Sequence, residues 1–99
     1  MVTHAIKGST VANVGMATAT IASDQSWCKH IFIKSTNPTT TFDVKLTDRY
    51  NLDIYTITDV TGELSDPIDL PTYGNWTLTI SNASIDESFD YLFTYITML

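Results

Sequence analysis

The residues able to hold a metal or attack a substrate are few in this chain. It has two histidines, His4 and His30, and one cysteine, Cys28. On a β-strand Cys28 and His30 would face the same side, as two metal ligands need to. A zinc site needs three or four ligands, however, and no further cysteine or histidine completes the set at a recognised spacing. We therefore interpret Cys28 as a structural residue and predict no metal site.

Motifs of catalysis and nucleotide binding are absent from the sequence. There is no G-x-S-x-G segment to present a nucleophilic serine, and neither histidine stands beside a suitable nucleophile. No G-x-G-x-x-G or Walker-type loop is present to bind the phosphates of a cofactor. We predict that the protein is not an enzyme, has no catalytic residues and carries no cofactor.

Four carboxylates, Asp59, Glu63, Asp66 and Asp69, crowd the segment from Asp59 to Leu70. Oxygen ligands of this kind suit hard cations such as calcium. The segment lacks the alternating carboxylates and the closing glutamate of an EF-hand loop, so we interpret these residues as solvated acids in turns. A surface calcium site in the Asp59–Asp69 segment is the alternative that the sequence leaves open.

Aromatic side chains could form a stacking platform for a sugar; the set is Trp27, Trp76, Tyr50, Tyr55, Tyr73, Tyr91 and Tyr95. Trp76 alternates in phase with Leu78, and Trp27 in phase with Ile31, which predicts that both tryptophans belong to the core. Two tyrosines in turn segments are left as candidates for binding a ligand or a partner: Tyr50 and Tyr73.

Charge and composition restrict the partners further. The formal net charge is −6, so the long-range field repels nucleic acid and anionic lipid, and the five basic residues are scattered. One cysteine allows no internal disulfide. No basic and apolar leader and no window of about 18 apolar residues is present, so we predict neither secretion nor membrane anchoring.

These residues are positioned by β-strands, which alternating apolar and polar residues predict. The clearest are Thr41–Asp48 and Asn75–Ser81, each with one apolar and one polar face. Four further strands are expected at Met16–Ala22, Trp27–Ser35, Leu52–Thr58 and Ser88–Met98. The second of these four is apolar on both faces, which predicts burial on both sides. The last is also apolar on both faces, with tyrosine hydroxyls that can reach water. The last also fits helical spacing, but its Phe, Tyr, Thr and Ile content favours a strand.

Turn residues separate these strands at intervals of roughly 8–12 residues, the spacing typical of a β-sandwich. The expected turns include Ser35–Pro38, Asp48–Asn51, Asp59–Gly62, Asp66-Pro67, Pro71–Gly74 and Asn82–Ser84, with further breaks at Gly8 and Gly15. We predict one all-β domain over residues 1–99, an antiparallel β-sandwich or jelly-roll-like barrel of about six to eight strands. Residues 1–15 are either an N-terminal arm that contacts a neighbour or the first strand of the sandwich.

Three parts of the sequence together resemble a known class of protein. They are the Gly/Ser/Thr/Ala stretch from Gly8 to Thr20, the strand Phe42–Asp48, and Leu70-Pro71 leading into Gly74–Asn82. This pattern resembles the small β-sandwich virion proteins of tailed bacteriophages, above all capsid decoration (cement) proteins. The Gly74–Ile80 strand also looks like a strand of other jelly-roll modules, including the P domains of proteases. No binding motif defines decoration proteins, so no functional residues are transferred.

The resemblance implies a structural protein on the capsid surface of a virion, made in the host cytoplasm. It implies that the partners are the major capsid protein and further copies of this chain. A tail, neck or fibre component is the alternative within the same class. A carbohydrate-binding β-sandwich module is the alternative from another class, and it predicts exposed Tyr or Trp side chains gathered on one face.

Overall fold

A computed structural model describes residues 3–12, 15–83 and 87–97 of the chain, and the regular structure in these ranges is β throughout. There are six strands: β1 (Thr3–Ala12), β2 (Ala17–Ser35), β3 (Thr41–Thr47), β4 (Asp53–Thr61), β5 (Glu63–Ser81) and β6 (Glu87–Thr97). All pair antiparallel, in the order β1-β6-β2-β5-β3-β4. The all-β fold class is confirmed, and the described residues contain no helix that could cross a membrane.

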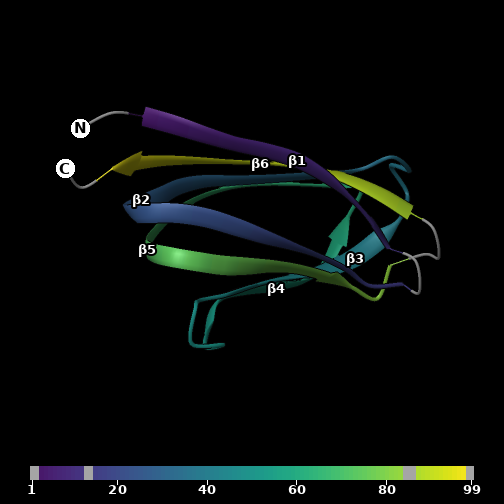
Figure 1. Cartoon of the computed structure of the whole chain (residues 1–99). Coiled ribbons are helices and arrows are strands. Elements are labelled where there is room, and N and C mark those ends of the chain that lie inside the picture. Colours follow the sequence, from purple (N-terminus) through teal and green to yellow (C-terminus); the bar gives the residue numbers. More distant parts are fainter. Residues whose placement is uncertain (1–2, 13–14, 84–86, 98–99) are drawn as a thin grey trace.

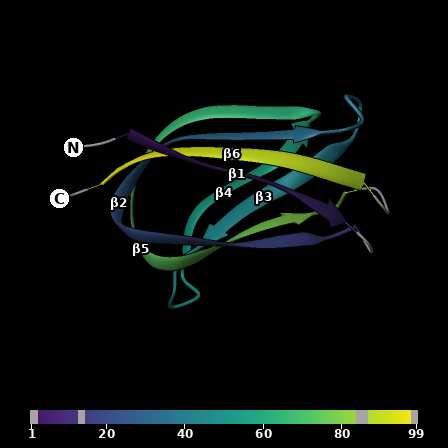
Figure 2. The same ribbon diagram turned by 45° about the horizontal axis from the view of Figure 1, so that its top comes forward.

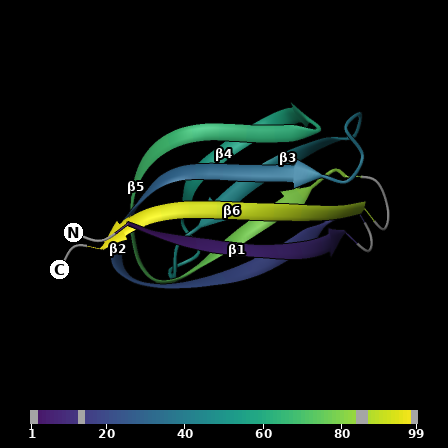
Figure 3. The ribbon, with the colours of Figure 1, turned by 90° about the horizontal axis from the view of Figure 1, so that it is seen from above.

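The continuous sheet folds over into two layers because β2 and β5 bend together (Figure 1). Their register shifts between Ser23 and Ser26, opposite Gly74, whose φ of +76° is available to glycine at no steric cost. Layer A contains β1, β6, residues 26–35 of β2 and residues 63–72 of β5. Layer B contains residues 17–23 of β2, residues 74–81 of β5, β3 and β4. Figure 3 shows the layer A strands lying side by side above the others.

Several expected boundaries were wrong for one physical reason. The predicted strands Met16–Ala22 and Trp27–Ser35 are joined in β2, and the predicted turns Asp66-Pro67 and Pro71–Gly74 lie inside β5. In layer A, β5 pairs with β2 alone and forms an edge, where a proline costs no ladder hydrogen bond. The residues that predicted turns at Asp66-Pro67 and Pro71–Gly74 are therefore part of the edge strand β5 and do not end it.

The N-terminal segment forms a strand in this structure. β1 pairs with β6 from Thr3 opposite Ile96 to Ala12 opposite Glu87, as the outer strand of layer A. Gly8 is not a turn: the Tyr91 ring occupies the space where a Cβ atom at Gly8 would lie. Of the two interpretations of residues 1–15, the one in which they begin the sandwich as its first strand fits β1. The C-terminal stretch is the strand β6, as its composition predicted, and Met98 lies outside the described residues.

The core lies between the layers and is closed by aromatic contacts across them. Trp76 of layer B meets Phe93 of layer A edge to face at 4.9 Å, and Phe42 meets Phe89 in the same way at 4.9 Å. Around them pack buried aliphatic residues, Ile21, Ile31, Ile33, Val44, Leu46, Leu78 and Ile80. The prediction that Trp76 is a core residue is confirmed, since it is 2% exposed.

The Glu87 carboxylate joins two segments of the chain at one end of the sandwich. Glu87, the first residue of β6 and 9% exposed, accepts hydrogen bonds from the Ser35 hydroxyl, the Asn37 N–H (2.9 Å) and the Thr36 hydroxyl (3.4 Å). The Ser35 hydroxyl is the main cause that holds the pKa of Glu87 below its ordinary value of 4.5. The loop after β2 is thereby tied to the start of β6.

Acid should weaken the hydrogen bonds that the Glu87 carboxylate accepts. A carboxylate whose pKa is lower in the folded state adds stability that is complete above about pH 4.5 and is lost as the pH falls through the folded pKa. We expect Glu87→Gln to be less stable than the parent at pH 7 and to lose less further stability on acidification. Urea unfolding from pH 7 to pH 3 measures this, with Glu63→Gln, an exposed acid, as the control. A Glu87→Gln variant with the parent's full acid dependence would contradict the assignment.

Candidate interaction surface

Cys28 and His30 do not face the same side of the sheet. Lys29 forms a bulge in β2, with Cys28 opposite Tyr95 and His30 opposite Thr94. Cys28 is buried, which raises the pKa of its thiol to about 11, and its Sγ–H donates to the carbonyl of His30 at 3.8 Å. Within the described residues no group of three or more His, Cys, Asp or Glu side chains could hold a metal ion.

Strand pairing brings His30 to a serine that the sequence could not associate with it. His30 Nε2 lies 2.9 Å from Ser65 Oγ, across β2 and β5, with both side chains on the exposed surface of layer A. Nucleophilic catalysis also needs an acid that orients the histidine and donors that stabilise an oxyanion. The His30–Ser65 contact is a hydrogen bond between two side chains on the surface of layer A. His4 lies in β1, and its side chain is outside those described.

Two of the four acids in the Asp59–Asp69 segment have different side-chain partners. Asp69 forms an ion pair with Lys29 at 2.8 Å, and Asp66 accepts a hydrogen bond from the Tyr55 hydroxyl at 2.7 Å. Burial, followed by the contact with Asp66, raises the pKa of Tyr55 well above its ordinary range. The backbone N–H of Asp59 donates to Asp43, and Glu63 is exposed. Among the residues that the structure describes, these acids form no group that could hold a metal ion.

Of the two candidate tyrosines, Tyr50 is 67% exposed in the turn between β3 and β4. Tyr73 lies within β5, not in a turn, and its side chain is outside those described. The prediction that Trp27 is a core residue was wrong. The bulge at Lys29 reverses the alternation, so Trp27 lies on the side opposite the buried Cys28 and is only partly buried.

The outer surface of layer A carries two apolar cross-strand pairs, with His30 and Thr94 between them, and we call it the apolar face. Phe32 pairs with Leu92 and Trp27 with Ile96, and all four side chains are partly buried on the side away from the core. A row of charged residues borders the Phe32–Leu92 pair, in register across three strands: Asp90, Lys34 and Glu63. The sequence predicts that Trp27–Ser35 is buried on both faces, but in the described residues only the inner face of this segment is covered by the other layer.

The outer surface of layer B has the opposite character. Thr18, Thr79, Lys45 and Thr56 stand in register across its four strands. Thr20, Thr77 and Thr47 form the next row. Hydroxyl groups and an ammonium group are well solvated, so this face is suited to contact with water. The two outer surfaces therefore differ in the side chains that they present.

The turn between β3 and β4 projects from the sandwich on the layer B side (Figures 1 and 2). Asp48 Oδ1 accepts hydrogen bonds from the N–H groups of Tyr50 (2.8 Å) and Leu52 (2.9 Å), and Asn51 adopts a left-handed φ of 63°. The Arg49 guanidinium lies 4.8 Å from the Tyr50 ring centroid and donates to the Tyr50 hydroxyl at 2.6 Å. The turn thus presents Tyr50 and the 62% exposed Leu52 in a fixed conformation.

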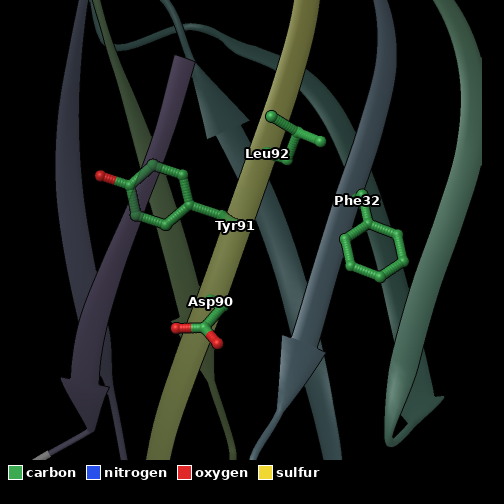
Figure 4. A pocket seen from close by; sticks show the side chains of 4 residues that line it. All are labelled: Phe32, Asp90, Tyr91 and Leu92. Carbon is green, nitrogen blue, oxygen red and sulfur yellow. The ribbon is translucent and has the colours of Figure 1, made fainter. Parts of the chain in front are cut away.

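A shallow depression of about 210 Å³ lies on the apolar face (Figure 4). Phe32 lines it from β2, and Asp90, Tyr91 and Leu92 line it from β6. Its lining is mostly hydrocarbon, with the Asp90 carboxylate at one end. Pockets that bind small molecules usually measure about 300–1,000 Å³. The depression is therefore of a size for one or two side chains of a partner.

Comparison with known proteins supports the fold. No family model and no curated protein matches the sequence. The structure of PirA is similar over 93% of both chains, with 8% identity and a TM-score of 0.52. A carbohydrate-binding module, CBM36 in complex with calcium and xylotriose, aligns over 94% of this chain and 88% of its own, with 16% identity and a TM-score of 0.44. A chain of infectious bursal disease virus, Gx strain, aligns over 97% of this chain and 32% of its own, with 13% identity and a TM-score of 0.37. The PirA similarity shows the fold alone, and the other two are too distant to bear on function.

Proposed function

We propose that the protein is a non-enzymatic structural protein of a virion, of the capsid decoration type, which lays its apolar face against neighbouring protein subunits. The observation that carries this proposal is the difference between the two outer surfaces, one centred on Trp27, Phe32, Leu92 and Ile96 and the other on threonines. Exposed apolar patches rimmed by charge are typical of protein interaction sites, and large aromatic residues supply much of their binding energy.

The fold suits a bracing role. A sandwich whose two layers share β2 and β5 is a rigid support, and the side chains of the apolar face are held by the pairing of β2 with β6 on both sides of the bulge at Lys29. The major capsid protein and further copies of this chain are the partners that we propose for it. The aromatic residues do not favour a sugar platform. Trp76 is buried and Trp27 lies on the apolar face, while Tyr50 belongs to the β3–β4 turn, which projects on the layer B side (Figure 1).

Quantitative mass spectrometry of purified virions tests the location. We expect this chain at a fixed, large fraction of the copies of major capsid protein. A dozen or fewer copies per particle would place it in the neck, tail or fibre instead. Its absence from virions would overturn the proposal and favour the carbohydrate-binding module.

Binding to empty capsids tests the surface. We expect the double variant Phe32→Ser/Leu92→Ser to bind capsids at least tenfold more weakly than the parent, on the scale of lost hot-spot residues, and to protect them less against heat. The control is Thr18→Ser/Thr79→Ser, a cross-strand pair on the outer surface of layer B, which should bind like the parent. Equal binding by both double variants would show that the apolar face is not the contact surface.

A further inference from the structure

We propose that one occupant of the apolar face is the β3–β4 turn of a second copy of this chain, so that copies assemble head to tail. Tyr50 and Leu52 of one copy would fill the depression at Phe32 and Leu92 of the next. Arg49 would lie at the Asp90 end of that depression. This inference rests on the proposed function, because it names a partner for the same face.

The two surfaces match in their apolar character. The turn exposes Tyr50 by 67% and Leu52 by 62%, which is unusual for side chains of this size, and the depression offers Phe32 and Leu92 as a mostly hydrocarbon floor. Its volume of about 210 Å³ suits an inserted side chain. Tyrosine with arginine beside it is also the composition that protein interfaces favour at their centres.

The two surfaces also match in charge. The projecting turn carries one cation, Arg49, between two carboxylates. Asp48 accepts two N–H groups of the turn, and Asp53 pairs with Lys45 at 4.0 Å. Beside the depression, the row Asp90, Lys34 and Glu63 places two carboxylates around one ammonium group. That row has a surplus negative charge, which attracts the guanidinium of an incoming Arg49. A second copy offers such a cation next to the apolar side chains that the depression can take.

The positions of the two surfaces determine the kind of assembly. The turn projects on the layer B side, whereas the depression lies on the outer surface of layer A, so a chain cannot fill its own depression (Figures 1 and 4). Contacts between two different surfaces form closed rings where the rotation between copies closes, and otherwise filaments. The hydrogen bonds that Asp48 makes within the turn fix its shape before binding, which lowers the entropic cost of the contact.

The test uses two variants that each damage one half of the contact. Tyr50→Ser removes the inserted ring, and Phe32→Ser removes part of the depression. We expect the parent chain to form oligomers in sedimentation velocity at 0.15 M salt as its concentration rises, and each variant alone to weaken that association at least tenfold. An equimolar mixture of the two variants should form a dimer and nothing larger, because only one intact contact can form per pair. Urea unfolding of each variant confirms that it is folded, and Thr79→Ser serves as the control.

A parent chain that stays monomeric at every concentration would overturn the inference. So would oligomers that both variants form as well as the parent, since a different surface would then be responsible. A monomeric chain that still binds capsids through the apolar face would overturn the inference and leave the proposed function in place. A chain that assembles as described yet is absent from virions would retain the inference and overturn the proposed function.

Discussion

Replacing Trp76 with alanine is expected to lower the free energy of unfolding by about 3–5 kcal/mol, the range for truncating a large aromatic residue in a core. Trp76 is 2% exposed and packs edge to face on Phe93 at 4.9 Å, so the substitution removes a contact that joins the two layers. A domain of this length is stabilised by only about 5–15 kcal/mol in total. Urea unfolding at pH 7 measures the loss.

Trp27→Ala is the matched control for this prediction. The same side chain is removed, but from a partly buried position on the apolar face, so no closed cavity forms. We expect a clearly smaller loss than at Trp76. A loss under about 1 kcal/mol at Trp76, the scale of a surface change, would place Trp76 outside the core and return it to the set of possible sugar-binding residues.

The second large effect is expected at Gly62, in the turn between β4 and β5. Its φ is +71°, and a Cβ atom there would collide with the backbone carbonyl of Pro38. Gly62 also donates to the Thr40 carbonyl and accepts from the Ser35 N–H, each at 2.8 Å, so it cannot move without breaking those bonds. Holding a residue with a side chain in this conformation costs about 1–3 kcal/mol. Moving the loop after β2 adds to that cost in Gly62→Ala.

Gly74→Ala separates the two contributions to this loss. Gly74 has a similar φ of +76°, but the atom nearest to an added Cβ is the side-chain Cδ of Arg49 at 3.3 Å, which can shift. We expect Gly74→Ala to lose only the conformational part, and Gly62→Ala to lose more in the same urea titration. Equal losses would mean that the loop holding Pro38 yields without cost.

Local alternation was enough to predict the strands whose pairing is regular. Phe42, Val44 and Leu46 are buried in β3 as their spacing predicts, and Trp76, Leu78 and Ile80 are buried in β5. These segments have one apolar and one polar face, so a period of two fixes both the strand and its orientation. The all-β sandwich followed from such segments without any homologue.

The features that carry the candidate site could be predicted only in part. An inserted residue at Lys29 reverses the alternation in β2, so Trp27 points outward although it is in phase with Ile31 by count. The contact between His30 and Ser65, 35 residues apart, depends on a register that no local pattern contains. The sequence shows apolar residues on both faces of β2 and β6. It does not show which of the two faces packs against the other layer.

Because β2 and β5 run through both layers, the two halves of the sandwich are not separable units. Their antiparallel ladder brings together residues as distant as Ala17 and Ile80, and it must close before either layer has its full set of strands. Folding therefore depends on pairing segments that are far apart along the chain, the situation in which β-proteins fold on a timescale of roughly milliseconds to seconds. During that interval the partly apolar strands of layer A are exposed, and an encounter with another copy can precede completion of the fold.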